Sequence, residues 1–572
     1  MMIELITSLS GYFIIACTLE GWGSIPLFRA STQRQVSFFS SNIWLGWCYV
    51  LILAQLWHFF LPISWKTSLS VMVIGLCSFI FSKRKLLLTV TENGHGWGVF
   101  AMKMTVLVGL VSLITWRAML SPTLYDSGLY HFTAIRWLNE YPLVPGLGNL
   151  HTRLAFNQSF FCYPALLNVY PYFMKGANVA VSSLLIFVLA ESLHLCWLSI
   201  STGLKKIIYS RLFLQLFLPI LLLTPLKWSL SSPAPDYASF LVQIILMYHF
   251  LKFLEAASDS REEGYEIHFI IIIALTLITL KLSNAAFSLV LVLSMVSGKI
   301  FKSRKVTLQA GKNFLSQLAY MVFLAGGIII IWCARGAMIS GYPLYPSSFA
   351  ALDVDWKVPW YKITSDRRWI YSWARQPQKY PKEVLRSWQW LKPWLKRHKK
   401  SANVAYPFYI FCVALMINVV MIVVTGIRRK IWPDFSCWMG IIPCLAGIGF
   451  WFFTAPDPRF VGSLVWISSF LALLPLSFYL PLESIKYGTI ILLLLSVIAG
   501  RDLYLTFPTF RFEKIREVSC KEFTTESGLT VYVPLNTDLC WDSPLPCSPY
   551  SKDSLHLRGH KITSGFRIIP VE

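Results

Sequence analysis

The stretch that decides the fold is "GVFAMKMTVLVGLVSLITWRA" (98–118), closely followed by "SPTLYDSGLYHFTAIRWLNEYPLVPGLGNLHTRLAFNQSFF" (121–161). The first part is apolar and long enough to cross the roughly 30 Å hydrocarbon core of a bilayer. The second part brings Asp, His, Arg and Asn together with Gly and Pro at the end of that span. Irregular backbone beside a membrane must be covered by protein or water. We therefore expect the second part to fold over one end of a helical bundle.

The rest of the chain has the composition of an integral membrane protein. Of its 572 residues, 55% are hydrophobic and 14% are charged, whereas a soluble domain has roughly 25% charged residues. We predict an all-α polytopic membrane protein with about 12–14 transmembrane helices over residues 1–500. The apolar stretches lie near 3–19, 43–62, 67–82, 98–118, 177–198, 206–225, 237–254, 266–281, 284–297, 314–334, 405–425, 433–453, 461–480 and 486–500.

Short basic connectors predict the orientation of this bundle, because Lys and Arg in short loops stay on the cytoplasmic side. Four such connectors fall on one predicted face: "SKRK" (82–85), "GLKK" (203–206), "GKIFKSRK" (298–305) and "IRRK" (427–430). The loops 119–176 and 335–404 and the tail 501–572 are then external. The acidic connector 255–265 falls on the inner face and is the exception to this pattern.

The external loop 335–404 is basic and rich in tryptophan, with fourteen Lys and Arg, four Asp and Glu and seven Trp. Its end, "YPKEVLRSWQWLKPWLKRHKK" (380–400), predicts an amphipathic helix in the membrane interface, with Trp388, Trp394 and Leu395 in the acyl boundary. The loop is either an interfacial anchor or a cradle for an anionic lipid-linked substrate. Because much of the net charge of +23 lies here, we expect membrane lipids as partners, and no nucleic acid.

The tail 501–572 is predicted to be a small external domain, either α/β or rich in β-strands. Its segment "GLTVYVPLN" (528–536) is typical of a strand between turns. Cys540 and Cys547 bracket the loop "CWDSPLPC", and a disulfide between them suits an oxidising compartment. Cys520 would then be left over, so the sequence leaves the pairing open.

Polar residues at the ends of several predicted spans are candidate site residues. Charged groups are costly at membrane depth and usually face a cavity or a partner. These candidates are Asp236 in "SSPAPDYAS", Lys281 in "LITLKLSNAA", Arg335 and Tyr342 in "CARGAMISGYPLYPS", and Asp457 and Arg459 in "TAPDPRFVG". Each could instead form a local structural pair, for instance Asp457 with Arg459. If they serve one function, Asp236, Arg335 and Arg459 should line one cavity together with Asp126.

Asp126 opens the segment "DSGLYHFTAIRWLNE" (126–140), whose apolar spacing predicts a short amphipathic helix. Its carboxylate is either the N-cap of that helix or a functional group. His131 and Arg153, further along the same loop, are likewise either ordinary surface residues or ligands of a substrate.

This arrangement resembles the GT-C superfamily of glycosyltransferases, in which the first large external loop carries an Asp soon after a spanning helix. The chain also resembles a family of bacterial multispan membrane proteins that is related to this superfamily. This second resemblance covers nearly the whole chain from about residue 98. The phrases that carry this second resemblance are "YDSGLYHFTAIRWLNEYPLVPGLGNLHTRLAFNQSFF", "SSPAPD", "SGYPLYPS", "APDPRF" and "CWDSPLPCSPY". A single Asp126 stands where the superfamily usually has an Asp-x-Asp or Glu-x-Asp pair.

The resemblance implies an inverting transfer of a sugar from a polyprenyl-phosphate-linked donor to a glycan or lipid acceptor, with Asp126 as the general base. It requires no resident cofactor, and the single Asp leaves the use of a divalent cation open. The implied contacts are Lys281, Arg335 and Arg459 with phosphate, Arg153 and His131 near the sugar or leaving group, Asp236 and Asp457 with sugar hydroxyls or these cations, and Tyr342 stacked on a sugar.

The resemblance also implies a multi-pass protein of the bacterial inner membrane, with its active site and tail on the external, periplasmic side. A different class of function remains open: a transporter, flippase or polymerase for lipid-linked saccharides would need the same basic groove. Such a protein would not use Asp126 as a base.

Overall fold

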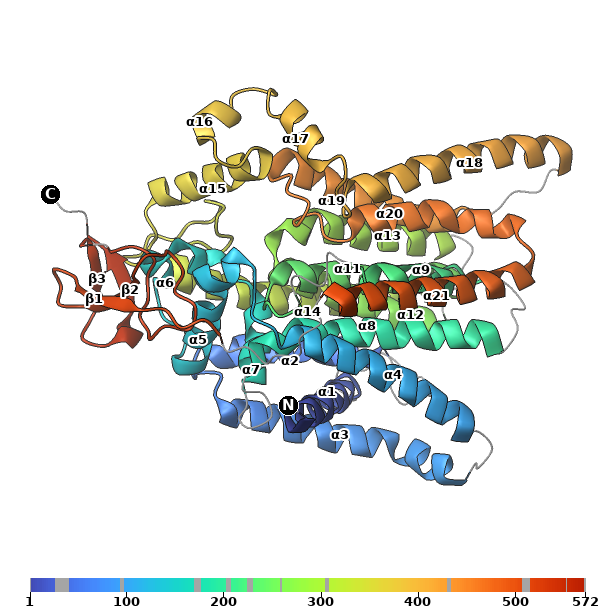
Figure 1. Ribbon diagram of the computed structural model, residues 1–572, viewed down its shortest axis with the longest axis horizontal. Coiled ribbons are helices and arrows are strands. Elements are labelled where there is room, and N and C mark those ends of the chain that lie inside the picture. Colours follow the sequence, from blue (N-terminus) through green and yellow to red (C-terminus); the bar gives the residue numbers. More distant parts are fainter. Residues whose placement is uncertain are drawn as a thin grey trace.

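The computed structural model describes residues 2–25, 41–92, 97–168, 176–201, 207–223, 230–257, 260–303, 308–429, 434–506, 515–551 and 553–569. Most of these residues are helical, and nine segments within the described helices are long and apolar enough to cross a membrane. Long helices form one bundle, and the C-terminal strands lie at one end of it (Figure 1). The chain is therefore a polytopic helical membrane protein with a small β tail, as predicted.

Each of the fourteen predicted apolar stretches contains a helix. The helices are α1 (Met2–Gly23), α2 (Asn42–His58), α3 (Trp65–Glu92), α4 (Trp97–Ala118), α8 (Gly176–Ser201), α9 (Tyr209–Leu221), α11 (Pro235–Glu255), α12 (Arg261–Leu280), α13 (Ala285–Ser303), α14 (Leu308–Ser340), α18 (Ala405–Arg429), α19 (Ile441–Thr454), α20 (Leu464–Leu473) and α21 (Leu482–Thr506). Helix α21 thus continues past residue 500, where the bundle was predicted to end.

The centre of the bundle consists of helices that are apolar on all sides. In α8, α11 and α12, 78%, 83% and 89% of the most apolar window is buried, whereas the corresponding share in α18 is 11%. The outer helices therefore expose large apolar side chains, such as Phe81 of α3 and Met416 of α18. Large apolar side chains that face outward are unfavourable in water. The exposed surfaces of the outer helices are therefore suited to contact with lipid.

Shorter elements cover the left-hand end of the bundle in Figure 1. The loop after α4 forms η2 (Ser127–His131), α5 (Phe132–Glu140), α6 (Leu147–Leu150), η3 (Thr152–Phe156), η4 (Ser159–Phe161) and α7 (Cys162–Leu167). The basic loop after α14 forms α15 (Trp360–Arg375), α16 (Pro381–Val384) and α17 (Leu391–His398). Both polar loops that the sequence singles out therefore lie at the same end of the molecule.

The tail forms two small antiparallel sheets, one from β1 (Cys520–Thr524) and β2 (Thr530–Pro534), the other from β3 (Leu555–Leu557) and β4 (Phe566–Ile568). The strand predicted in 528–536 is β2. The disulfide between Cys540 and Cys547 is present, which resolves the pairing that the sequence leaves open. Phe566 N–H donates to Pro145 O (2.9 Å), so the tail packs on the loop after α4.

Two of the predicted basic connectors differ from expectation. "SKRK" (82–85) lies inside α3, where Lys83 is buried and pairs with Glu20 of α1 (Nζ–Oε1, 3.0 Å). Lys299, in the connector 298–305, belongs to α13 and pairs with Glu263 (2.5 Å). These lysines neutralise buried glutamates, which no local pattern reveals. The connector "GLKK" (203–206) lies outside the described residues.

The amphipathic helix predicted over 380–400 is broken into α16 and α17. Trp388 and Leu395 are exposed, with relative exposures of 58% and 55%, as an interfacial role requires. Trp394 is buried, and its Nε1–H donates to Pro456 O (2.6 Å). The placement of Trp394 in the acyl boundary was therefore wrong, because its indole anchors the basic loop to the loop between α19 and α20.

Candidate functional site

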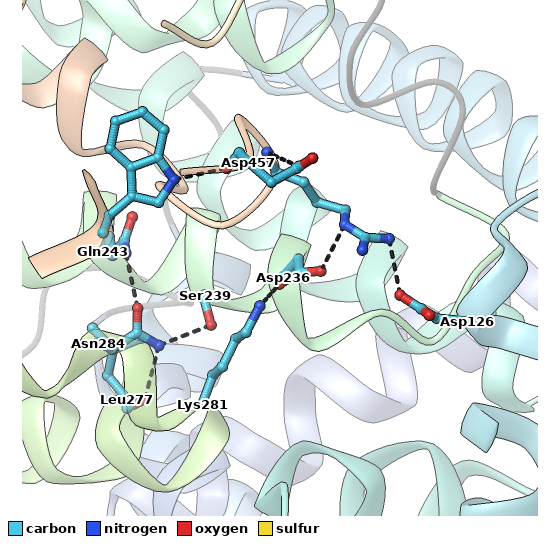
Figure 2. A network of polar contacts seen from close by, with 10 residues as sticks. Asp126, Asp236, Ser239, Gln243, Leu277, Lys281, Asn284 and Asp457 are labelled. Atoms are coloured by element: carbon cyan, nitrogen blue, oxygen red, sulfur yellow. Dashed lines mark hydrogen bonds and ion pairs between the residues drawn. The ribbon is translucent and has the colours of Figure 1, made fainter. Parts of the chain in front are cut away.

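Four charged side chains from distant parts of the chain meet in one group of ion pairs, and Figure 2 shows three of them labelled, Asp126, Asp236 and Lys281. Arg459 Nη1 lies 2.9 Å from Asp126 Oδ2, and Arg459 Nε lies 3.5 Å from Asp236 Oδ2. Lys281 Nζ pairs with the other oxygen of Asp236. We call these four residues the charged cluster. It contains two carboxylates and two cations, so its formal charges cancel.

Helix geometry places Asp236 beside Lys281. Pro235 occupies the first turn of α11, where its missing N–H costs no hydrogen bond, and Asp236 follows in the same turn. Lys281 is the C-cap of α12, with extended backbone at φ −159° and ψ 123°. Helices α11 and α12 are in contact, and the start of one meets the end of the other. The predicted break at Lys281 is thus the position from which its side chain reaches Asp236.

The loop between α19 and α20 positions Arg459. Asp457 Oδ1 accepts a hydrogen bond from Arg459 N–H (2.9 Å), and Trp451 Nε1–H donates to Asp457 O (2.7 Å). Burial raises the pKa of the Asp457 carboxyl. Asp457 therefore shapes the turn through the backbone of Arg459, which is a local pairing of the kind left open by the sequence.

Asp126 lies in a helical turn, but it does not cap the helix that follows. Its backbone is αR (φ −60°, ψ −25°), and its side chain makes no capping hydrogen bond. The N-cap interpretation is therefore wrong: the carboxylate pairs with Arg459. Burial lowers the pKa of the Arg459 guanidinium, but the carboxylates of Asp236 and Asp126 raise it more, so this pKa lies above its usual value.

The side chains of the charged cluster are partly exposed. Side-chain exposure is 26% for Asp126, 24% for Arg459 and 19% for Lys281, and it falls to 12% for Asp236. Asp236, the most buried of the four, holds both cations. Lys281, Arg459 and Asp126 can therefore exchange partners with an incoming polar molecule. Asp236, at the buried side of the cluster, would keep the two cations in place.

Two aromatic residues that the sequence analysis did not select lie against the cations. Lys281 Nζ is 3.9 Å from the centre of the Phe460 ring, and Arg459 Cζ is 5.0 Å from it. Arg459 Cζ also lies 5.7 Å from the ring centre of Trp373 in α15. The position of Phe460 directly after Arg459 was an available signal, but nothing local marks Trp373.

A neutral hydrogen-bond network braces the elements behind the charged cluster (Figure 2). Asn284 Nδ2 donates to Ser239 Oγ (3.0 Å), and Gln243 Nε2 donates to Asn284 Oδ1 (2.9 Å). Gln243 Oε1 in turn accepts from Ser463 N–H (2.8 Å). The network joins α11, the turn after α12 and the start of α20, which are the elements that present Asp236, Lys281 and Arg459.

The structure does not bring Arg335, Arg153 and Tyr342 into this cluster. Arg335 and Arg153 line a separate cavity beneath α5. Tyr342 is 1% exposed, and its hydroxyl donates to Val358 O (3.1 Å), so its ring is enclosed by protein and has no face open to a sugar. The expectation that Arg335 lines one cavity with Asp126 is not met, because Arg335 sits in α14 and pairs with Asn157 instead.

His131 lies behind the charged cluster. It is buried, and its electrostatic environment includes Asp126, Asp236, Arg459 and Lys281. Burial lowers the pKa of His131 to about 4, so the ring is neutral at neutral pH. It therefore adds no positive charge to the site under those conditions.

A family comparison covers most of the chain. The family described as "Domain of unknown function (DUF8201)" matches residues 1–466. The chain belongs to this family. All four residues of the charged cluster lie within the matched region, and the tail with the Cys540–Cys547 disulfide lies beyond it. No curated protein and no solved structure matches the chain.

A divalent cation would need several carboxylate or other oxygen ligands grouped around one point. Within the described parts of the chain, no group of three or more His, Cys, Asp and Glu side chains is arranged to hold a metal. The carboxylates of Asp126 and Asp236 already bind Arg459 and Lys281. In this structure the partners of these two carboxylates are therefore basic side chains.

Proposed function

We propose that the protein is a membrane glycosyltransferase that moves a sugar from a polyprenyl-phosphate-linked donor to a glycan or lipid acceptor, with inversion at the anomeric carbon. One observation carries this proposal: the carboxylate of Asp126 pairs with Arg459, and Arg459 shares the largely buried carboxylate of Asp236 with a second cation, Lys281. A general base and a phosphate-binding pair are the two parts that this reaction needs side by side.

Asp126 is proposed as the general base. An acceptor hydroxyl that donates a hydrogen bond to its carboxylate loses its proton as the oxygen attacks the anomeric carbon. The new bond joins the acceptor oxygen to that carbon, and the bond from the carbon to the lipid phosphate oxygen breaks. The electron pair leaves with the phosphate, and the proton stays on Asp126.

Arg459 and Lys281 are proposed to stabilise the departing phosphate. Charge that develops on a leaving group is stabilised best by cations already fixed in place, and both cations are fixed by Asp236. The fork of a guanidinium matches phosphate oxygens. A phosphate bound to Arg459 would compete with Asp126 for that guanidinium, so donor binding would release the base.

Phe460 and Trp373 are proposed as surfaces for the sugar. Trp373 is 44% exposed, and both rings already lie beside Arg459. Aromatic faces bury the apolar side of a sugar ring. This assignment replaces Tyr342, whose ring is enclosed by protein.

The proposed external position of the site is supported by the disulfide. Cys540–Cys547 belongs to the tail that packs over the loop carrying Asp126. Disulfides persist in oxidising compartments such as the bacterial periplasm. The proposal therefore places this end of the bundle on the periplasmic side of a bacterial inner membrane.

A transfer assay tests the proposal with the purified full chain in lipid nanodiscs, a polyprenyl-phosphate-linked sugar carrying a label, and a set of glycan and lipid acceptors. General-base catalysis contributes about 10²–10⁴-fold to rate, so Asp126→Asn should lose about that factor. Glu140→Gln, which changes an exposed carboxylate on the neighbouring α5, is the matched control and should keep the parental rate.

Transport of the lipid-linked sugar is measured in parallel in sealed vesicles. If Asp126→Asn transfers sugar as fast as the parent, the assignment of the base is wrong. If the parent moves the lipid-linked sugar across the bilayer without transferring it, and Asp126→Asn does the same, the alternative of a flippase or transporter replaces the proposal.

A further inference from the structure

A small cavity lies beneath α5, its lining does not include the charged cluster, and this lining is mostly apolar with five polar side chains. Its volume is about 40 Å³, and its polar lining residues are His58, Arg153, Asn157, Gln158 and Arg335. A water molecule needs roughly 10–15 Å³ of such volume, so the cavity has room for a few oxygen-sized atoms. None of the lining residues that the structure describes is an Asp or Glu.

Arg335 is a buried cation without a carboxylate partner in the part of the chain that the structure describes. The residue is 5% exposed, and its Nη1–H donates to Asn157 Oδ1 (2.8 Å). Its Nε–H has no hydrogen-bond partner. A buried charge is costly unless an opposite charge compensates it. An anion in the cavity would supply that compensation.

Asn157 holds Arg335 in this position. Its backbone is left-handed (φ 50°), a conformation that Asn tolerates better than most residues. Asn157 Nδ2–H donates to Trp332 O (2.7 Å), and Trp332 Nε1–H donates to Asn157 O (2.8 Å). These two bonds tie η3 to α14 one turn before Arg335. The guanidinium is therefore pre-positioned at the wall of the cavity.

Two further groups on the wall have unused hydrogen-bonding capacity. His58 Nε2 bonds to Tyr141 O (3.1 Å), which makes Nε2 the donor and leaves Nδ1 without a partner. Gln158 Oε1 is also without a partner, and a rotation of this amide would present Nε2 instead. Acceptor oxygens of a ligand can use Arg335 and a rotated Gln158 amide, and a protonated oxygen of the same ligand can donate to His58 Nδ1.

Arg153 supplies a second cation where the cavity reaches the surface. Arg153 and Phe156 are partly exposed, unlike Arg335. Arg153 Cζ lies 5.5 Å from the ring centre of Phe156, and within the described residues no ion pair holds it. Arg153 acts electrostatically on Tyr130, as do Asp126 and Arg459 of the charged cluster.

We infer that this cavity binds a phosphate group, with Arg335 at its inner wall and Arg153 at its mouth. Two guanidinium groups converging on one small cavity favour a doubly charged oxyanion, because each can offer two N–H groups to its oxygens. The phosphate can come from a soluble compound or from a lipid headgroup. This site is separate from the proposed transfer site and does not depend on Asp126.

The test measures thermal unfolding of the purified full chain in detergent as inorganic phosphate is added at constant ionic strength. A ligand that binds only the folded state raises the unfolding midpoint as it saturates. We expect a saturable rise for the parent and at least a tenfold weaker apparent affinity for Arg335→Met and for Arg153→Gln. Without phosphate, Arg335→Met should be no less stable than the parent, because it removes an uncompensated charge.

Arg375→Met is the matched control, because Arg375 donates to the carbonyl oxygens of Phe453 and Thr454 and lies outside the cavity lining. It should keep the parental phosphate response. Should Arg335→Met fail to fold, Arg153→Gln and Gln158→Leu must show the weakened response instead. Nanodiscs of phosphatidylcholine with and without phosphatidic acid distinguish a lipid headgroup from a soluble phosphate. The inference is overturned if neither source stabilises the parent, or if the variants respond as the parent does.

Discussion

The indole ring of Trp541 packs directly on the backbone of Gly128. A Cβ atom at residue 128 would lie 2.5 Å from Trp541 Cε2, and Trp541 N–H donates to Gly128 O (2.8 Å). Gly128 lies in η2, the turn that follows Asp126. The tail is thus joined to the chain segment that presents the proposed general base.

Gly128→Ala should separate the tail from this turn. An added methyl group at 2.5 Å must displace either the indole or the turn, and overpacking of this kind costs about 1–3 kcal/mol. We expect a loss of that size in unfolding free energy and a lower rate of sugar transfer, measured on the purified chain. Gly264→Ala, in α12 with open space around its Cβ position, is the control. Equal stability of both variants would contradict the close contact.

Asp236→Asn should destabilise the protein more than the loss of an ordinary surface ion pair. Asp236 is 12% exposed and holds both Lys281 and Arg459, so the substitution leaves two partly buried cations less well paired. We expect a loss of about 2 kcal/mol in unfolding free energy. Glu140→Gln breaks the exposed pair with Arg136 and should cost under about 1 kcal/mol. If Glu140→Gln lost more unfolding free energy than Asp236→Asn, Asp236 would not be the carboxylate that holds the two cations together.

His131 should make stability depend on pH in the acidic range. Burial lowers its pKa from 6.5 to about 4, so the unfolded chain binds this proton more readily than the folded chain. Its contribution is full above pH 6.5 and is lost as the pH falls through 4, by about 3 kcal/mol in total. His131→Asn should flatten this part of the profile, as measured by unfolding at pH 7 and pH 4.5. The exposed His560→Asn should keep the parental profile, and a profile that His131→Asn leaves unchanged would refute the assignment.

Loss of the Cys540–Cys547 disulfide should loosen the tail. The two cysteines are separated by seven residues in sequence, and closing a loop of that size stabilises a folded chain by about 2–3 kcal/mol. The double replacement by serine should increase cleavage of the tail by protease and lower the unfolding midpoint. Cys520→Ser, which leaves the disulfide intact, is the control. A double variant that resists protease like the parent would show that the tail is held by packing alone.

The two ends of the bundle should be labelled from opposite sides of the membrane. Tyr550→Cys is at an exposed tail position (59%), and Ser201→Cys is at the exposed end of α8. In a background with Cys77 and Cys412, the exposed native cysteines, changed to serine, a membrane-impermeant maleimide should label residue 550 in intact cells and residue 201 only after lysis. The opposite result would reverse the proposed orientation.

The positions of the long helices could be predicted because each depends on a local run of apolar residues. Pro235 at the start of α11 and the polar break at Lys281 also act locally, and both mark helix ends in the structure. Burial of Lys83 inside α3 was not predictable in this way. Its partner, Glu20, lies on another helix, and a run of four residues such as "SKRK" is typical of an exposed connector.

The charged cluster was predicted only in its parts. Asp236, Lys281 and Arg459 were selected because charges are costly near a membrane, and Asp126 because of its place in the first external loop. Their pairing depends on how distant helices pack. For Asp126, the sequence left open whether the carboxylate caps the helix that follows, and in the structure it pairs with Arg459 instead. Trp373 was missed because its proximity to Arg459 depends on the path of the whole basic loop.

The order in which the cluster residues are synthesised has a consequence for membrane insertion. Asp126 emerges from the ribosome first, and Asp236 and Lys281 follow and can pair as soon as α11 and α12 form a hairpin. Arg459 is made much later, only shortly before α20. Until Arg459 has been synthesised, the carboxylate of Asp126 therefore has no guanidinium partner. A chain that ends before residue 459 would therefore carry an Asp126 carboxylate without the guanidinium that neutralises it.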